Sequence, residues 1–270
     1  MKLCFSTLGC PGWSWNEIFA TSKDLGMKGI EVRGVANEMF VPKIKEFSEG
    51  RREDTLARLE KAGMEISMLT SGACLGVEQP ERYMEEARAY IDFAPLVGAK
   101  YVRVMITSVP YPSEEEDVEQ AARLYRELCR YAEGKGVKVL LETSGALADS
   151  HVLAQVMQNT GSPAAGVLWD IHHPYRYFGE RPEQTYENIG PWVEHLHVKD
   201  SVQGEEKVEY RMMGYGDVPV FDTLKLLKEH GYEGYISLEW VKRWCPELQE
   251  PGIVFSHYAS YMTFLMNQLD

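Results

Sequence analysis

One local pattern recurs along the chain: a helix-like segment, then a glycine, then a short apolar run. The glycines that share this position are Gly26, Gly63, Gly98, Gly136 and Gly231. A glycine closes a helix in the left-handed conformation and lets the chain turn sharply into a strand. With three further apolar runs, the sequence predicts eight strands, at residues 2–7, 29–33, 65–69, 101–105, 138–142, 165–170, 193–199 and 235–239.

Helical patterns lie between the predicted strands, at residues 15–24, 48–62, 80–97, 114–134, 149–160, 182–190, 220–230 and 253–268. Strict alternation of strands and helices indicates parallel strands joined by crossover helices. Eight such units in 270 residues favour a closed (β/α)8 TIM barrel over an open doubly wound sheet. No GxGxxG follows the first strand, which disfavours a dinucleotide-binding sheet. Because no linker interrupts the pattern, we predict a single domain over residues 1–270.

Four predicted strands end in side chains that suit a divalent metal: Glu142, Asp170, His197 and Glu239. The C-terminal ends of the strands form the active-site face of such barrels. A buried carboxylate without a partner costs several kcal/mol, so three together would require a cation. We therefore expect these four side chains to converge on one divalent ion. The oxygen-rich set favours Mn²⁺, Mg²⁺ or Co²⁺, and it is also compatible with Zn²⁺.

Such a site would support proton transfer on a small substrate. A metal that holds two adjacent substrate oxygens polarises a carbonyl and stabilises an enediolate. Glu142 and Glu239 come from different strands and are expected to act as general base and acid. In the competing interpretation, these residues are surface carboxylates at strand ends. Four suitable side chains at the ends of consecutive strands argue against that interpretation.

Four further side chains are candidates for substrate contacts. His173 follows the sixth strand, and Lys199 shares the inward face of His197, although an ion pair with an acid is an equally good interpretation of this lysine. Arg211 lies in an expected loop over residues 201–219 and offers a planar fork to substrate oxygens. Trp13 is expected to provide an apolar surface against which a sugar ring could pack, although a tryptophan more often packs in the core.

Three polar residues on predicted strands have simpler interpretations. His195 is expected to be a hydrogen-bonded core histidine. Glu31 and Arg33 end the second strand and could reach the cavity, but an ion pair between them or with neighbours is the default interpretation.

Composition narrows the class of protein. The net charge of −13 would repel a phosphate backbone, so we expect no nucleic-acid partner. No apolar run approaches the roughly 20 residues that span a bilayer, and the N-terminus resembles a strand rather than a signal peptide, so we expect a cytoplasmic protein without a membrane partner. Five scattered cysteines without a CxxC pair indicate reduced thiols. Homo-oligomerisation stays open.

Six short motifs together resemble a known family. They occupy residues 5–11, 141–143, 170–174, 195–200, 214–219 and 238–240. The chain is similar to sugar isomerases and epimerases with a xylose isomerase-like TIM barrel, a superfamily that includes tagatose epimerases, inosose dehydratases and endonuclease IV-type repair enzymes. The resemblance implies metal ligands at Glu142, Asp170, His197 and Glu239, with the two glutamates doubling as acid/base residues. It also implies substrate contacts at His173 and Arg211.

The departures from the superfamily narrow the expected chemistry. The ends of the second and third strands give Arg33 and Thr70-Ser71 instead of the histidines and acids of a trinuclear zinc cluster. The acidic cluster that holds the second metal of true xylose isomerases is also missing. We therefore expect a divalent-metal-dependent isomerase or epimerase of a small sugar, ketose or sugar-derived polyol. The alternatives are an inosose (cyclitol) dehydratase, a metal-dependent endonuclease-like phosphodiesterase and a non-catalytic carbohydrate-binding barrel.

Overall fold

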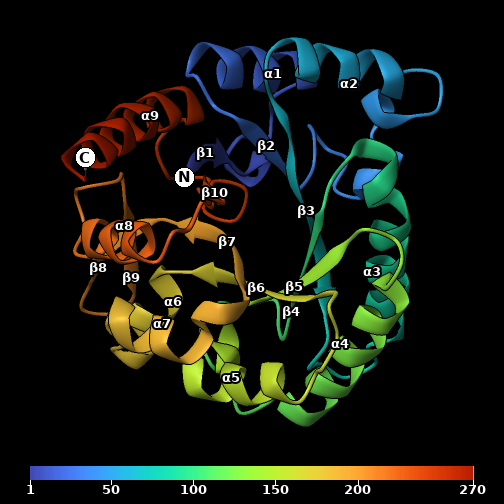
Figure 1. The fold of residues 1–270 in the computed structure, drawn as a ribbon. Helices are drawn as coiled ribbons and strands as arrows, with labels where there is room; N and C mark the ends of the chain where they lie inside the picture. Colours follow the sequence, from blue (N-terminus) through green and yellow to red (C-terminus); the bar gives the residue numbers. More distant parts are fainter. Residues whose placement is uncertain (270) are drawn as a thin grey trace. The chain divides into compact units, whose positions relative to one another are not determined.

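The computed structural model describes residues 1–269 and alternates strands with helices along the chain (Figure 1). One sheet has the strand order β1-β10-β7-β6-β5-β4-β3-β2. Its strands are β1 (Lys2–Phe5), β2 (Gly29–Val32), β3 (Glu65–Cys74), β4 (Tyr101–Met105), β5 (Lys138–Glu142), β6 (Ala165–Asp170), β7 (Val193–Val198) and β10 (Tyr235–Leu238). The eight predicted strands are confirmed, and the fold is the (β/α)8 TIM barrel.

The predicted helices are also confirmed, with shifts at their ends. They are α1 (Trp15–Asp24), α2 (Arg52–Lys61), α3 (Glu81–Phe93), α4 (Val118–Ala132), α5 (Ser150–Gln158), α7 (Pro182–Ile189), α8 (Val220–Glu229) and α9 (Pro251–Gln268). Short 3₁₀ turns lie at Thr7–Gly9, Val41–Lys43, Lys45–Phe47, Ala94–Val97, Gly145–Ala148 and Gly190–Trp192. The five glycines of the repeated pattern all have positive φ, between 68° and 72°. The turn that the sequence predicts is therefore the turn that the chain makes.

The chain divides into two compact units, and the first comprises Met1–Ser67 and His197–Asp270. Strands β1 and β10 pair in parallel from Lys2 and Tyr235 onward. A parallel bridge between Ser6 and Glu31 joins the end of β1 to β2, and these are the two edge strands of the sheet order. The sheet closes at this bridge. The Phe5 ring stacks on Phe255 of α9 with 4.0 Å between centroids, which anchors α9 to the sheet.

The second unit comprises Met68–Leu196 and contains the parallel ladder of β3, β4, β5 and β6. Its inward-facing core includes Met68, Leu140 and Leu168, with Tyr101 packed against it. The boundaries between the units fall inside β3 and β7, and the single domain over residues 1–270 stays a prediction.

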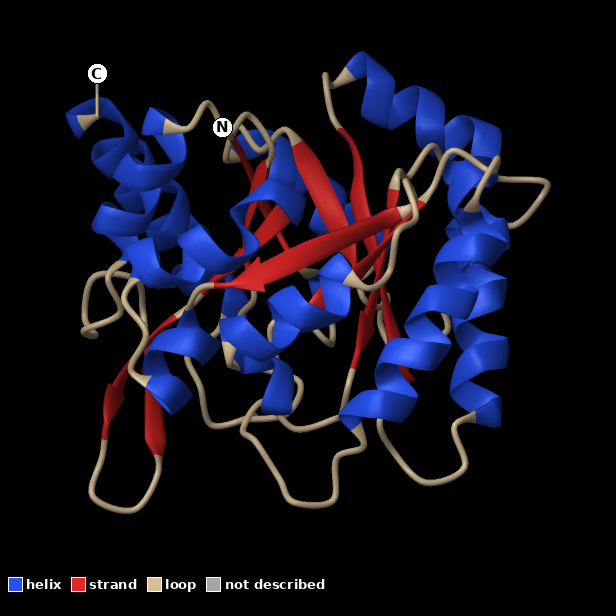
Figure 2. Ribbon diagram, turned by 60° about the horizontal axis from the view of Figure 1, so that its bottom comes forward, coloured by secondary structure: helices blue, strands red, loops and turns tan. Residues whose placement is uncertain are grey.

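Three elements differ from the sequence prediction. The expected loop over residues 201–219 contains an antiparallel hairpin of β8 (Asp200–Gln203) and β9 (Val208–Arg211), drawn as two short strands in Figure 2. These strands are short and mostly polar, so their pattern resembles a loop. An additional helix, α6 (His172–Phe178), begins directly after β6, and β3 runs five residues beyond its predicted end at residue 69, through small residues of low strand propensity.

Candidate active site

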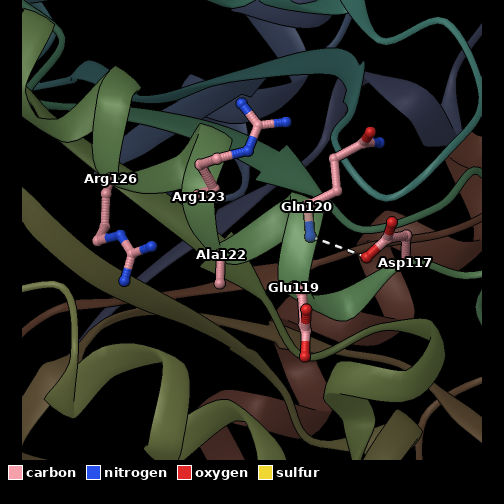
Figure 3. A pocket seen from close by; sticks show the side chains of 6 residues that line it. All are labelled: Asp117, Glu119, Gln120, Ala122, Arg123 and Arg126. Carbon is pink, nitrogen blue, oxygen red and sulfur yellow. Dashed lines mark hydrogen bonds between the residues drawn. The ribbon is translucent and has the colours of Figure 1, made fainter.

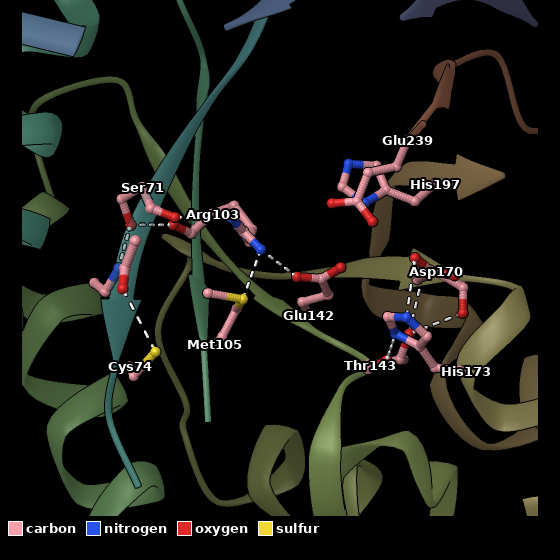
Figure 4. Close-up of polar contacts among 12 residues, drawn as sticks. Ser71, Cys74, Arg103, Met105, Glu142, Thr143, Asp170, His173, His197 and Glu239 are labelled. Atoms are coloured by element: carbon pink, nitrogen blue, oxygen red, sulfur yellow. Dashed lines mark hydrogen bonds and ion pairs between the residues drawn. The ribbon is translucent and has the colours of Figure 1, made fainter. Parts of the chain in front are cut away.

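In the first unit, His197 near the end of β7 lies between two carboxylates. Its Nε2 atom is 2.9 Å from Oε2 of Glu31 on β2, and both side chains are fully buried. A carboxylate accepts hydrogen bonds, so Nε2 carries the hydrogen, and in the neutral imidazole Nδ1 keeps its lone pair. Nδ1 in turn lies 3.5 Å from Oε1 of Glu239 (Figure 4). A lone pair and a carboxylate oxygen that face each other at this distance are a donor set for a cation.

Glu239 follows the last residue of β10, and its backbone N–H donates to the carbonyl of Val198 at 3.1 Å. Its second carboxylate oxygen, Oε2, accepts from Nζ of Lys199 at 2.5 Å. Lys199 is 1% exposed and Glu239 is 6% exposed, so water does not screen this ion pair. The acid partner expected for Lys199 is present, but the lysine is buried rather than solvated at the rim, and its substrate contact stays a prediction. One oxygen of Glu239 therefore lies beside His197, and the other is held by Lys199.

Asp200 orders the segment that follows the hairpin. Its carboxylate oxygens accept from the backbone N–H groups of Ser201, Gly214, Gly216 and Val218. A Cβ atom added to Gly216 would lie 2.1 Å from Oδ1 of Asp200, so only glycine fits there. No role of Asp200 is predicted from the sequence. The available signal was an aspartate directly after a predicted strand together with the two glycines, Gly214 and Gly216, in the expected loop that follows it.

In the second unit, Glu142 is the last residue of β5 and is 1% exposed. Oε2 of Glu142 accepts from Nη1 of Arg103, in the middle of β4, at 2.6 Å (Figure 4). The Nη2 atom of Arg103 donates to the carbonyl of Ser71 at 2.8 Å, which fixes the guanidinium. This contact of Arg103 is not among the predictions from the sequence. The available signal was a charged residue inside the otherwise apolar run Tyr101–Met105.

Asp170 ends β6, and the start of α6 wraps around it. Its Oδ1 accepts from the backbone N–H of His172 at 3.0 Å. The ring of His173 is fixed through Nδ1, which lies 2.8 Å from the carbonyl of Thr143. A carbonyl only accepts, so Nδ1 carries the hydrogen, and Nε2 of His173 lies 3.6 Å from Oδ2 of Asp170. In its neutral form, His173 therefore presents a lone pair beside Asp170, suited to accept from a substrate hydroxyl.

Two predicted contact residues have other partners. Arg211 ends β9 and forms an ion pair with Glu209, with both side chains partly exposed. Trp13 is half-buried and packs edge-on against Phe255 at 5.6 Å between centroids, which matches the packing interpretation. Their contacts with substrate stay predictions. Glu31, for which a local ion pair was the default expectation, instead contacts His197, a partner that was not predicted.

A hollow of about 550 Å³ lies along α4 (Figure 3), and none of the residues that line it is a predicted site residue. Its lining includes acids and arginines of the solvated helix surface, namely Asp117, Glu119, Gln120, Ala122, Arg123 and Arg126. Asp117 accepts from the backbone N–H of Gln120 at 2.8 Å and so caps the helix. This hollow is a feature of the helix surface and does not contribute to the candidate site.

The chain was compared with families of known proteins and with curated relatives. Residues 19–254 match the family model described as the xylose isomerase-like TIM barrel. The fructoselysine 3-epimerase of Shigella flexneri is 25% identical over 259 residues, which covers 92% of each chain. The inosose dehydratase of Clostridium perfringens is 25% identical over 67% of this chain and 71% of that protein.

Solved structures show the same fold. A xylose isomerase-like TIM barrel protein from Mycobacterium smegmatis in complex with magnesium has a TM-score of 0.76 and 18% identity, covering 100% of this chain and 98% of that one. The IOLI protein with a bound zinc atom has a TM-score of 0.77 and 16% identity, covering 100% and 99%. At these identities the comparison supports the fold. No helix within residues 1–269 is long and apolar enough to cross a bilayer, and all five cysteines are free thiols.

Proposed function

The chain belongs to the xylose isomerase-like TIM barrel family, and we propose that it is a divalent-metal-dependent isomerase or epimerase of a small sugar, ketose or sugar-derived polyol. The observation that carries this proposal is the arrangement around His197. Its Nε2 hydrogen is directed to Glu31, so the lone pair of Nδ1 is directed toward Glu239. A histidine held in this way by a second carboxylate is typical of a metal ligand.

We propose that Glu142, Asp170, His197 and Glu239 hold the ion. All four are buried, and three carboxylates with one imidazole are a ligand set that could bind a divalent metal. The relatives with bound magnesium and zinc support a divalent ion without fixing which one. When bound, the ion would supply positive charge that polarises a substrate carbonyl and stabilises the negative charge that develops on oxygen.

The two glutamates are proposed to move the protons. One ionised glutamate takes the proton from the carbon next to the substrate carbonyl, and the C–H electron pair moves toward the carbonyl oxygen. The other glutamate, protonated at the start, returns a proton to carbon or oxygen, so the total number of protons is unchanged. Arg103 and Lys199 fix the positions of the two side chains, because each donates a buried hydrogen bond to one oxygen of Glu142 or Glu239. His173, Lys199, Arg211 and Trp13 are proposed to position the substrate.

A second candidate reaction is dehydration of a cyclitol. The similarity to inosose dehydratase favours it, and the similarity to fructoselysine 3-epimerase favours epimerisation. Both reactions begin with removal of a proton next to a carbonyl. They differ afterwards, because the dehydratase expels a hydroxyl group from the neighbouring carbon, whereas the epimerase retains every hydroxyl.

The test is proton exchange in D₂O. The protein is loaded with Mn²⁺, Mg²⁺, Co²⁺ or Zn²⁺, mixed with a panel of ketoses, fructosamine-type sugars and inososes, and followed by NMR. Deuterium at the carbon next to the carbonyl, with all hydroxyls retained, supports isomerisation or epimerisation. A new absorbance from a conjugated carbonyl identifies the dehydratase instead.

Two variants connect the exchange to the proposed residues. Glu142→Gln and Glu239→Gln keep the size of each side chain but cannot accept the proton, and each should lower the exchange rate by at least about 100-fold. Glu127→Gln, at an exposed position on α4, is the matched control and should keep the wild-type rate. Absence of exchange with every metal and every sugar would contradict the proposal and favour a carbohydrate-binding barrel.

A further inference from the structure

Helix α9 lacks charge over its full length. Its 18 residues, Pro251–Gln268, contain no Asp, Glu, Lys or Arg, although 26% of the whole chain is charged. One side of the helix is buried in the first unit, through Val254, Phe255, Tyr258, Ala259, Met262 and Leu265. A helix on the surface of a monomer normally carries polar and charged residues on its other side. The opposite side of α9 is therefore unusual for a surface that faces water.

That opposite side, which we call the outer face of α9, consists of six residues at helical spacing. They are Ile253, Ser256, His257, Ser260, Tyr261 and Phe264. Ile253 and Phe264 are the large apolar ends of the face, 60% and 59% exposed. The rings of His257 and Tyr261 stack between them, 6.0 Å apart and nearly parallel at 11°.

Three of the four polar side chains of the outer face, those of Ser256, His257 and Ser260, already have partners within the first unit. The hydroxyl of Ser256 donates to the carbonyl of Gly252 at 2.8 Å, and that of Ser260 donates to the carbonyl of Ser256 at 3.1 Å. Nε2 of His257 lies 2.7 Å from the carbonyl of Met213. If a partner covered this face, few polar groups would be left without hydrogen bonds. The free-energy cost of removing water from the face is therefore small. Depletion of charge with enrichment of aromatic residues marks the centre of protein interfaces.

The six residues are arranged symmetrically about a point between Tyr258 and Ala259, one residue before the middle of the helix. Ile253 and Phe264 lie equally far from this point, as do Ser256 and Tyr261, and His257 and Ser260. In an antiparallel copy of the helix, the Ile253 side chain would therefore face Phe264 of the other copy at both ends. In the middle, the rings of His257 and Tyr261 would face Ser260 and Ser256 of the other copy. Such self-complementarity is what a two-fold interface requires. We propose that the outer face of α9 is the dimer interface between two copies of this chain.

The charge of the chain also favours a second copy of the same chain as the partner that covers the outer face of α9. Each chain carries a net charge of −13, so contact between copies through most surfaces would bring like charges together. The uncharged outer face avoids this repulsion. The two serines, one turn apart at the centre, let the helix backbones approach closely. Tyr215, 66% exposed with its ring 5.6 Å from His257, extends the face into the segment ordered by Asp200.

The first test measures the mass of the intact protein by light scattering after size exclusion at about 20 μM, well above the Kd of a stable dimer. We expect a dimer for the wild type and a monomer for Phe264→Glu, which places a charge in both halves of the interface. Leu96→Glu, at a 49% exposed position in the second unit, is the matched control and should stay dimeric. A monomeric wild type, or a dimer that persists in Phe264→Glu, would overturn the proposal.

The second test fixes the orientation of the two helices. In a Cys245→Ser background, the double variant Ile253→Cys with Phe264→Cys should give a covalent dimer with a short bis-maleimide crosslinker. The single variant Ile253→Cys should not, because an antiparallel arrangement separates the two copies of residue 253 by about 16.5 Å along the helix, from 11 residues at 1.5 Å each. Equal crosslinking of the single and double variants would reject the antiparallel arrangement. The proposal does not depend on the catalytic activity.

Discussion

The Nε2 atom of His197 lies 2.9 Å from the Glu31 carboxylate, so one acid determines which nitrogen of the imidazole keeps its lone pair. The two residues are 166 positions apart in the chain. Their contact leaves the proposed metal ligand His197, in its neutral form, with one defined donor atom, Nδ1, which is directed at Glu239. This arrangement gives Glu31 a role that can be separated experimentally from that of the proposed ligands.

Replacing Glu31 should weaken metal binding without removing a proposed ligand. Glu31→Gln can still accept from Nε2 through its amide oxygen but loses the negative charge, whereas Glu31→Leu loses the hydrogen bond as well. Loss of such a supporting partner typically lowers metal affinity by about 10- to 100-fold. We expect Glu31→Leu to reach this range and Glu31→Gln to show a smaller loss, measured by calorimetric titration with Mn²⁺. Unchanged affinity in Glu31→Leu, with Glu229→Gln as the surface control, would rule out this role.

Removing Arg103 should destabilise the fold because it leaves the carboxylate of Glu142 buried without this partner. The two side chains are 5% and 2% exposed, and breaking a buried pair from one side costs about 3–5 kcal/mol. We expect Arg103→Met to lower the free energy of unfolding by this amount in urea denaturation of the metal-free protein. The double variant Arg103→Met with Glu142→Gln should recover part of the loss. If the double variant is no more stable than the single one, the ion pair is not the cause.

The segment after the hairpin should become mobile when Asp200 is replaced. Asp200→Ala removes the acceptor of four backbone N–H bonds. Gly216→Ala should have a similar effect by a different route, because its Cβ would collide with Asp200. We expect faster hydrogen exchange at the amides of residues 214–218 in both variants, with little change in α4. Asp222→Ala, an exposed acid in the first turn of α8, is the control. Unchanged protection in Asp200→Ala would contradict this prediction.

The cysteines should differ strongly in their reactivity. Burial raises the pKa of the Cys129 thiol to about 12, and it raises the pKa of Cys4 and Cys10 as well. These thiols stay protonated at pH 8, whereas Cys245 is only partly buried. We expect iodoacetamide to modify Cys245 first in the native protein and all five cysteines in urea, as counted by mass spectrometry. Rapid native modification of Cys129 would show that its surroundings open.

The same pKa values predict loss of stability in alkali. In the unfolded chain the Cys129 thiol has the ordinary thiol pKa of about 9.0, whereas burial in the folded protein raises its pKa to about 12. The folded state therefore keeps a proton that the unfolded state loses. The free energy of unfolding should fall as the pH rises above about 9, by up to about 1.4 kcal/mol per pH unit for each such thiol. Cys129→Ala should reduce this slope in urea titrations, and an unchanged slope would assign the effect to other groups.

The sequence by itself determined the order and type of most elements and the four proposed ligands. Glycine conformation, strand-length apolar runs and helical periodicity are local properties, so they are present in the chain before it folds. The position of Glu142, Asp170 and Glu239 at strand ends follows from the same local pattern. Even the left-handed turns at Gly26 and Gly231 could be anticipated from neighbouring residues alone.

Tertiary structure decided which side chains pair. Arg103 with Glu142, Lys199 with Glu239 and Glu31 with His197 join residues 39, 40 and 166 positions apart. Each pairing depends on the register between strands, and a shift of one residue would send a side chain to the opposite face of the sheet. No local pattern specifies that register, because it results from packing of the whole sheet. The roles of Glu31 and Arg103 therefore became visible only in the folded chain.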